Sequence, residues 1–230
     1  MVLKIMAFLS AMVVLASCGE TVSRSQDARI LAMGDSMLAW HATSHQSVSH
    51  ALEKQLGEEV IDRSVVGARV LYELPISGAL GLNIAKQYRP GNWDWIIVNG
   101  GGNDLWLGCG CFRCDRKMNR LALEDGSDGE IPRMIARLRM SGAKVIYVGY
   151  LRSPGVGSLI EHCRTEGNEL ERRIARYADT DEGVHFVSLA ELVPHGDRSF
   201  HSADMIHPSI KGSATIGAYI ARIIGGPTRP

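Results

Sequence analysis

The sequence has no excess of charge of either sign. Its 25 lysine and arginine residues balance its 25 aspartate and glutamate residues, so the formal net charge is zero at pH 7. It also has no run of five or more basic residues, the pattern by which many nucleic-acid-binding chains are recognised. Low-complexity tracts and internal repeats are missing as well. These absences argue against a nucleic-acid partner and favour an ordinary globular domain.

Long apolar runs are missing too, with one short exception near the N-terminus. Residues 5–16 are almost wholly apolar, but a membrane-spanning helix needs about 20 such residues. A run of this length after a positively charged start is typical of a secretory signal peptide. At its end, Leu15-Ala16-Ser17-Cys18-Gly19 resembles the lipobox of bacterial lipoproteins, in which the chain is cut before a cysteine that receives a lipid.

We therefore expect residues 1–17 to be a lipoprotein signal peptide, Cys18 to be the lipidated residue, and residues 18–27 to be a polar tether. The resemblance implies an exported protein, held by its lipid at a membrane in the periplasm or on the surface of a bacterium. Two alternatives stay open: a plain secretory signal with an incidental cysteine, or a short N-terminal helix.

Several common catalytic and nucleotide-binding motifs are absent. The chain contains no G-x-S-x-G, which excludes the nucleophile elbow of α/β-hydrolases. Gly100 to Gly102 does not continue as G-x-G-x-x-G, and no Walker A lysine motif occurs. The sequence therefore contains no recognisable loop for binding the phosphates of a dinucleotide or a nucleoside triphosphate.

What the chain does have is a regular alternation of short apolar runs and longer helical segments. The runs predict five strands, at Arg29–Met33, Val60–Val66, Trp93–Val98, Lys144–Tyr150 and Val184–Leu189. The longer segments predict helices at Ser44–Leu56, Ile76–Tyr88, Asp128–Met140, Leu159–Ala178 and Ser209–Ile224. This order predicts one domain over residues 28–226, a three-layer α/β/α sandwich around a five-stranded parallel sheet of the flavodoxin-like type.

Polar residues and glycines follow the predicted strands, where ligands of such sheets bind. Gly34-Asp35-Ser36 follows the first strand, Gly67 the second, and Gly101-Gly102-Asn103-Asp104 the third, while Asp204 to His207 precedes the last helix. A serine hydroxyl needs a base to take its proton, and the imidazole of His207 titrates near neutral pH. Asp204, three residues earlier, is placed to orient that ring. Ser36, His207 and Asp204 are therefore the candidate catalytic residues.

These four blocks resemble those of the GDSL/SGNH hydrolase superfamily, in the same order and over residues 34 to 207. The first block, Gly34-Asp35-Ser36-Met37, departs from the family only in having methionine where leucine is usual. The resemblance implies a serine esterase that cleaves carboxylic esters through an acyl-serine. It also implies an oxyanion hole formed by the backbone N–H groups of Ser36 and Gly67 and the side-chain amide of Asn103. Asp35 and Asp104 are expected to brace loops.

The same resemblance implies that neither cofactor nor metal is needed, and that the partner is a small-molecule, lipid or glycan ester; we expect a monomer. Three alternatives remain. An acyltransferase would use the same residues, with a sugar or lipid hydroxyl in place of water. A non-catalytic binding lipoprotein would leave Ser36 unused. Each block also has a structural explanation of its own: a helix cap at Asp35-Ser36, a proline at a helix start at Pro208, and loop geometry at the glycines.

Four cysteines remain besides Cys18: Cys109, Cys111, Cys114 and Cys163. An even number in an exported chain favours two disulfides, for which three pairings exist. The first three are expected in a loop beside Asn103, and the fourth at the start of the helix after strand four. Two disulfides would then fix the shape of an acyl pocket at the rim of the site. A Cys₄ zinc site and a catalytic thiol are the alternatives, although C-x-C-x₂-C is not the usual zinc spacing.

Histidines and tryptophans near these blocks have weaker assignments. His41, His45 and His50 are expected at solvated helix positions, with a metal cluster as the alternative. His201 lies close enough to Asp204 in the sequence to bind substrate or water. Trp40 and Trp106 are expected in the core, or lining the site.

Overall fold

The computed structural model describes residues 28–225 of the chain. Its five strands are β1 (Ile30–Met33), β2 (Val60–Asp62), β3 (Trp95–Val98), β4 (Lys144–Val148) and β5 (Val184–Val187). They form one parallel sheet in the order β2-β1-β3-β4-β5. This order is that of flavodoxin-like sheets. The predicted sandwich with a five-stranded parallel sheet is therefore confirmed, and the predicted signal peptide, Cys18 and tether lie outside the described residues.

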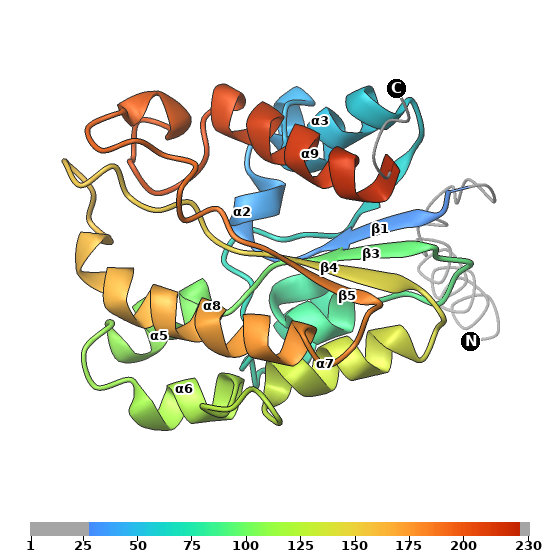
Figure 1. The fold of residues 1–230 in the computed structure, drawn as a ribbon, viewed down its shortest axis with the longest axis horizontal. Helices are drawn as coiled ribbons and strands as arrows, with labels where there is room; N and C mark the ends of the chain where they lie inside the picture. The colour runs from blue at the N-terminus through green and yellow to red at the C-terminus, as the bar shows by residue number, and fades with distance from the viewer. Residues whose placement is uncertain (1–27, 226–230) are drawn as a thin grey trace, which may run out of the picture.

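Helices cover both faces of the sheet, as Figure 1 shows. On one face lie α3 (Val48–Leu56) and α9 (Ile210–Gly225), which pack against each other. On the other face lie α5 (Gly102–Cys109), α6 (Asp115–Leu121), α7 (Glu130–Arg139) and α8 (Arg164–Ala178). The four-residue helix α2 (Ser36–Ala39) follows β1 directly. Among residues 28–225, no helix has both the length and the apolar composition that crossing a membrane requires.

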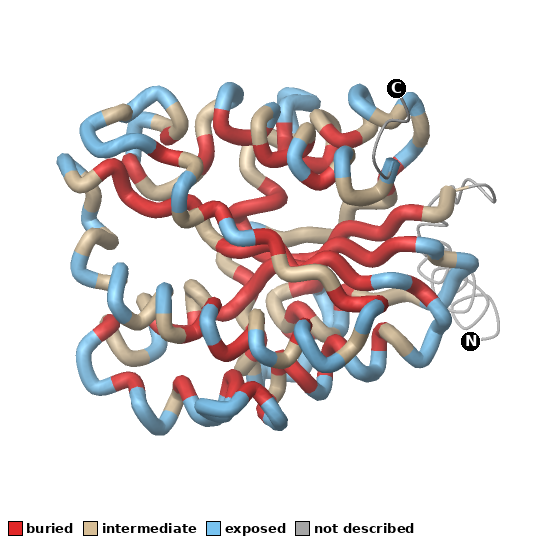
Figure 2. Tube along the Cα trace, in the orientation of Figure 1, coloured by how far each residue is buried: buried red, intermediate tan, exposed pale blue. Residues whose placement is uncertain are grey.

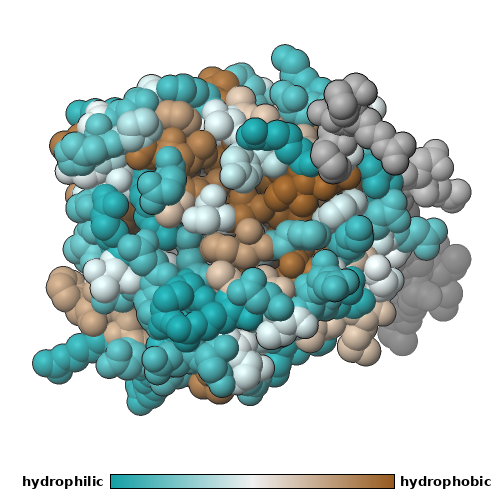
Figure 3. Space-filling model, viewed as in Figure 1, coloured by the Kyte–Doolittle hydropathy of each residue, from teal (hydrophilic) through white to brown (hydrophobic). Residues whose placement is uncertain are grey.

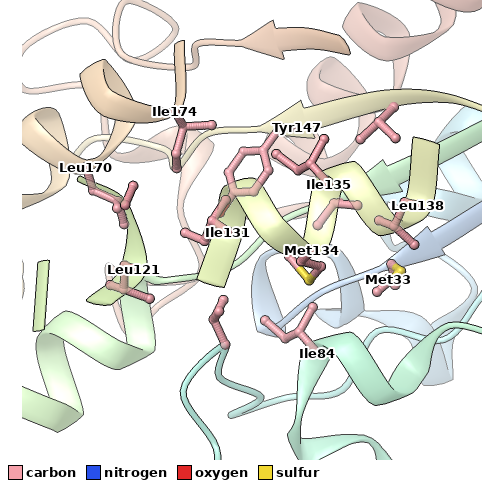
Figure 4. Packing of buried hydrophobic residues seen from close by; sticks show 14 of the residues in the cluster. Met33, Ile84, Leu121, Ile131, Met134, Ile135, Leu138, Tyr147, Leu170 and Ile174 are labelled. Carbon is pink, nitrogen blue, oxygen red and sulfur yellow. The ribbon is translucent and has the colours of Figure 1, made fainter. Parts of the chain in front are cut away.

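Each face of the sheet has its own apolar core. The core under α7 and α8 includes the labelled residues of Figure 4, in which side chains of α7 such as Ile131 and Ile135 pack toward Tyr147 of β4 and Met33 of β1. The other core joins β1, β3 and β4 to α3 and α9. Buried residues are concentrated along the strands in Figure 2, whereas the face seen in Figure 3 is mostly hydrophilic, with apolar patches between. Burial on both faces explains why the strands are almost continuously apolar.

The segment from 76 to 88 is not the single helix that its composition predicts. It consists of α4 (Pro75–Ser77), the π-helical turn η3 (Gly78–Leu82) and the 3₁₀ helix η4 (Ile84–Gln87). Gly81 has a φ of 106°, which a continuous right-handed helix does not allow. The side chain of Asn83 then begins η4 by accepting a hydrogen bond from the N–H of Lys86 at 3.3 Å.

Most predicted elements differ from the observed ones by one or two residues at an end, and three others differ by more. The helix predicted from Ser44 begins at Val48, because Ser47 is its N-cap; the 3₁₀ helix η2 (Ala42–Ser44) precedes it. The strand predicted to end at Val66 ends at Asp62, whose carboxylate accepts hydrogen bonds from the N–H and hydroxyl of Ser64 and so starts a turn. The helix predicted from Leu159 is divided into the 3₁₀ helix η5 (Glu161–Cys163) and α8.

The cysteine-rich segment is a loop, as predicted, but it lies between two helices that the sequence did not predict. Cys109 is the last residue of α5, and Cys114 immediately precedes α6, so only the four residues between them form a loop. A further 3₁₀ helix, η6 (Arg198–Phe200), precedes the Asp204–His207 segment. These differences leave the order of the sheet unchanged.

Candidate active site

Ser36 lies on a tight turn at the carboxyl end of β1. Gly34 is held by the buried side-chain amide of Gln87, which accepts from the Gly34 N–H at 2.6 Å and donates to the Gly34 carbonyl at 2.8 Å. A side chain at Gly34 would have its Cβ only 2.9 Å from the carbonyl oxygen of Asn99. The motif therefore has glycine here because two backbone segments approach closely, and this approach places Ser36 at the first position of α2.

Asp204 and His207 are in direct contact. The Nδ1 atom of His207 lies 2.6 Å from Oδ2 of Asp204. The other carboxylate oxygen accepts from the backbone N–H groups of Ile206 and His207, both at 3.0 Å. Burial opposes ionisation of Asp204, but the hydrogen bonds from the His207 ring and these two N–H groups outweigh it and lower the pKa of this carboxyl. A carboxylate thus fixes the orientation of the imidazole.

Ser36, His207 and Asn103 line the same cavity, which has a volume of about 110 Å³. The structure therefore brings together side chains from the first, third and last blocks, 171 positions apart at the extremes. Within residues 28–225, the Ser36 hydroxyl makes no hydrogen bond, including none to His207. In free enzymes such bonds are often longer than in the substrate complex.

The ring of His207 is stacked on the indole of Trp40. The ring centroids are 3.7 Å apart and the planes differ by 6°. Trp40 is the C-cap of α2, one turn after Ser36, and its backbone N–H donates to the Ser36 carbonyl at 2.9 Å. Its indole N–H donates to Ser202 Oγ at 3.0 Å, and the N–H of Ser202 donates to the His207 carbonyl at 2.8 Å. Trp40 thus links the serine turn to the histidine loop, a role that the sequence did not indicate.

We expect Trp40→Ala to lower kcat roughly 2- to 10-fold, because a stacked aromatic pair contributes about 0.5–1.5 kcal/mol and each 1.36 kcal/mol changes a rate tenfold. The indole face also favours the imidazolium that forms during proton transfer. Trp40→Phe keeps a ring but loses the bond to Ser202, and should retain most of the activity. Steady-state kinetics of both variants, with melting temperatures, measure this. A kcat of Trp40→Ala equal to that of the wild type would contradict it.

The three groups predicted to form the oxyanion hole lie at the same edge of the sheet. The Asn103 amide donates to the carbonyl of Ala68 at 3.1 Å and has a second N–H left for an oxyanion. Gly67, which precedes Ala68, has a φ of 79°, and its N–H has no acceptor within the described part of the chain. The N–H of Ser36, at the start of α2, is likewise unpaired there. Gly67 is not among the residues that line the cavity, although its neighbour Ala68 holds Asn103.

Asp35 and Asp104 brace the loops, as predicted. Asp104 accepts from the N–H groups of Val70 and Leu71 at 2.9 and 2.8 Å. Asp35 caps α2 by accepting from the Met37 N–H at 2.9 Å, and its other oxygen accepts from the hydroxyl of Tyr150 at 2.5 Å. The Tyr150 oxygen in turn accepts from the N–H of Gly102 at 2.9 Å. This chain of hydrogen bonds connects the ends of β1, β3 and β4.

Burial raises the pKa of Asp35 to about 6, and the hydrogen bonds from Tyr150 and Met37 limit the rise. Because the folded-state pKa lies above the ordinary 3.8, the stability that Asp35 contributes is complete below about pH 3.8 and is lost as the pH rises through 6. Between pH 7.5 and pH 5, this carboxyl alone should add roughly 1.4 kcal/mol to the free energy of unfolding.

We therefore expect Asp35→Asn to lack that gain. Urea unfolding at pH 5 and pH 7.5 measures the gain in the wild type, in Asp35→Asn and in Asp115→Asn, a control at an exposed carboxyl of α6. The control should behave as the wild type does. Equal pH dependence in all three proteins would show that Asp35 does not titrate in this range.

The four cysteines form two disulfides, Cys109–Cys114 and Cys111–Cys163. The first spans the turn between α5 and α6, and the second ties that turn to the start of α8. The predicted disulfides are thereby confirmed, and the structure selects one of the three pairings. The zinc site and the catalytic thiol are excluded for these residues, because a disulfide sulfur is not a thiolate. The one candidate metal cluster in the described residues, Cys111, His162 and Cys163, contains two of these sulfurs.

The remaining histidines are dispersed. His45 and His50 are in contact, with 3.0 Å between Nδ1 and Nε2, whereas His41 lies against Ser202, so the three form no joint cluster. His201 is buried, and neither of its ring nitrogens has a hydrogen-bond partner within residues 28–225. Burial lowers the pKa of His201. Trp106 lines the cavity, which is one of the two positions predicted for it.

The fold resembles several solved structures at low sequence identity. The inhibitor-bound aryl esterase of M. smegmatis superposes with a TM-score of 0.62 at 18% identity, over 86% of this chain and 98% of that one. Est24, a carbohydrate acetylesterase from Sinorhizobium meliloti, has a TM-score of 0.60 at 16% identity, over 85% and 97%. Likeness at this level establishes the fold alone. A search of curated proteins finds no match.

The architecture and the cluster of serine, glycine, asparagine and histidine at one sheet edge are those of an SGNH-type hydrolase. A family model agrees, since that of the GDSL-like lipase/acylhydrolase family matches residues 32–215. The chain belongs to this family, and membership supports hydrolase activity.

Proposed function

We propose that the protein hydrolyses carboxylic esters through an acyl-serine intermediate. The observation that carries the proposal is the 2.6 Å contact between His207 Nδ1 and Asp204 Oδ2, on a loop that shares a cavity with Ser36 and Asn103. The contact leaves Nε2 of His207 as the nitrogen that accepts the serine proton. Family membership supports the hydrolase class.

The reaction has two halves, acylation of Ser36 and hydrolysis of the acyl-serine, which use the same groups. As His207 takes its proton, the Ser36 oxygen forms a bond to the ester carbonyl carbon, and the carbonyl oxygen becomes negative. The N–H groups of Ser36, Gly67 and Asn103 donate to that oxygen. The bond to the alcohol then breaks, and the imidazolium gives its proton to the leaving oxygen. Water repeats the sequence on the acyl-serine, releases the acid and restores the Ser36 hydroxyl.

A fluorophosphonate probe tests this function directly, because it reacts covalently with an activated serine. The wild-type chain should be labelled at Ser36 and should release acid from simple aryl esters. Ser36→Ala should do neither, whereas Ser49→Ala, a control at a buried serine of α3, should do both. Equal labelling of the wild type and Ser36→Ala would show that the reactive group lies elsewhere, and an unlabelled wild type would favour a binding role.

We also propose that the chain is exported and anchored through lipid on Cys18. Two disulfides in the domain support the proposal, because such bonds persist in oxidising compartments outside the cytosol. A bacterium that expresses the full chain and is fed an alkyne-tagged fatty acid should label the wild type. Cys18→Ser should remain unlabelled. Labelling of both proteins, or of neither, would refute lipidation at Cys18.

A further inference from the structure

The cavity beside Ser36 extends between α5 and the start of α8, two helices that lie side by side in Figure 1. Its lining includes Ser36, Asn103 and His207 together with residues that have no part in the chemistry proposed above. An acyl group bonded to Ser36 therefore has this space directly next to its carbonyl carbon.

The other walls of the cavity are mostly apolar. They are formed by Leu105, Trp106, Ile160 and Ile206, and by the disulfide-bonded residues Cys111 and Cys163. Burying a hydrocarbon chain against such walls is favourable, because it removes apolar surface from water. A polar chain would find no hydrogen-bond partners on them.

The charged residues in the lining are paired, except that one carboxylate oxygen of Glu161 has no hydrogen-bond partner among the described residues; its negative charge would repel an anionic acyl group. The guanidinium of Arg152 binds both oxygens of Glu171 at 2.7 Å, and it also donates to Asn168 and to the Tyr150 carbonyl. Arg164 pairs with Glu161 at 2.8 Å, nearer to solvent. Because the buried Arg152 is satisfied within the protein, it provides no site for a carboxylate on the substrate. The cavity therefore suits an uncharged chain.

Gly167 is unusual among the lining residues. It lies inside the 15-residue helix α8, where glycine is a poor helix former. Apart from the helix's own backbone, a Cβ at this position would meet no heavy atom within 4 Å, so packing does not require glycine. Leu170 and Glu171, which share its face of the helix by spacing, are buried, and Arg164 on the same face lines the cavity with its side chain partly exposed. A larger side chain at 167 would take up cavity space.

The size of the cavity limits the length of the chain it can hold. An apolar protein cavity of about 150 Å³ accommodates benzene, with six carbons. In proportion, about 110 Å³ covers four or five carbons beyond the carbonyl carbon, and because the pocket is open on one side, a longer chain would extend into solvent.

We propose that this cavity is the acyl-binding pocket, that Gly167 and the Cys111–Cys163 disulfide set its depth, and that it selects uncharged acyl groups of two to about six carbons. This inference rests on the proposed ester hydrolysis at Ser36. Gly167 and the disulfide act as specificity-determining elements and take no part in the chemical steps.

The test is a chain-length profile of kcat/KM for the full-length protein on p-nitrophenyl acetate, butyrate, hexanoate, octanoate and decanoate. In the wild type, kcat/KM should rise with each buried CH₂, by up to about fourfold, and stop rising near hexanoate. A steady rise to decanoate would overturn the short-chain assignment.

Two variants at Gly167 test the depth of the pocket. Gly167→Leu should lower the hexanoate-to-acetate ratio of kcat/KM at least tenfold, and Gly167→Ala about two- to fourfold, while raising the melting temperature. Thr165→Leu, on the exposed side of the same helix, should keep the wild-type ratio. An unchanged ratio in Gly167→Leu with fluorophosphonate labelling intact would overturn the proposal. If Gly167→Leu does not fold, the ratio in Gly167→Ala decides.

The two disulfides provide a matched comparison. The double variant Cys111→Ser/Cys163→Ser removes the cross-link that holds the α5–α6 turn against the start of α8, so this wall can move outward and the octanoate-to-butyrate ratio should rise at least threefold. Cys109→Ser/Cys114→Ser removes the other disulfide and should leave the ratio unchanged. Equal ratios in both double variants would refute a role of Cys111–Cys163 in the pocket. A wild type that hydrolyses no ester and is not labelled would instead refute the proposed function itself.

Discussion

His207→Ala is expected to lower kcat by on the order of 10⁶, and Asp204→Asn by on the order of 10⁴. The difference follows from the two contacts of Asp204. An asparagine keeps the oxygen that accepts from the backbone N–H groups of Ile206 and His207, so the loop is preserved. Its amide would donate to Nδ1, at the position where the carboxylate oxygen now lies 2.6 Å away. The proton would then be placed on Nε2, the nitrogen that must accept from Ser36.

Single-turnover and steady-state rates of these two variants on one ester measure the two losses. His195→Ala, at an exposed histidine that does not line the cavity, provides the control and should retain the wild-type rate. The reverse order, with Asp204→Asn more damaging than His207→Ala, would mean that the carboxylate and not the imidazole accepts the serine proton.

Asn103→Ala is expected to lower kcat by about 10² to 10³ with little change in KM, because the amide stabilises charge that develops only in the transition state. Asn103→Asp preserves the size of the side chain but removes the donor and adds a negative charge, so its loss should be at least as large. Both variants also lose the bond to the Ala68 carbonyl, which is worth about 1 kcal/mol of stability.

Kinetics at a temperature well below the melting point of each Asn103 variant separate the two effects. A variant that melts earlier but retains kcat within threefold of the wild type would remove Asn103 from the oxyanion hole. The N–H groups of Ser36 and Gly67 would then be the remaining donors.

The fold followed from local patterns that do not depend on distant contacts. Strands such as β3 and β4 are short runs of buried apolar residues, and parallel strands share one carboxyl edge. Once the order of elements is known, that edge must collect Ser36, Asn103 and the residues before the last helix. The helix predicted over residues 76–88 was wrong because of one backbone angle, the positive φ of Gly81. The sequence around a glycine does not indicate which φ it adopts.

The sequence by itself determined the class of fold, the family to which the chain belongs and the set of candidate site residues, since periodicity and short motifs are local properties. Only the tertiary structure decided the cysteine pairing, the stacking of Trp40 on His207, the paired state of Arg152 and the open space at Gly167. Each of these depends on the distance between groups from separate elements. Packing fixes such distances, and no spacing along the chain encodes them.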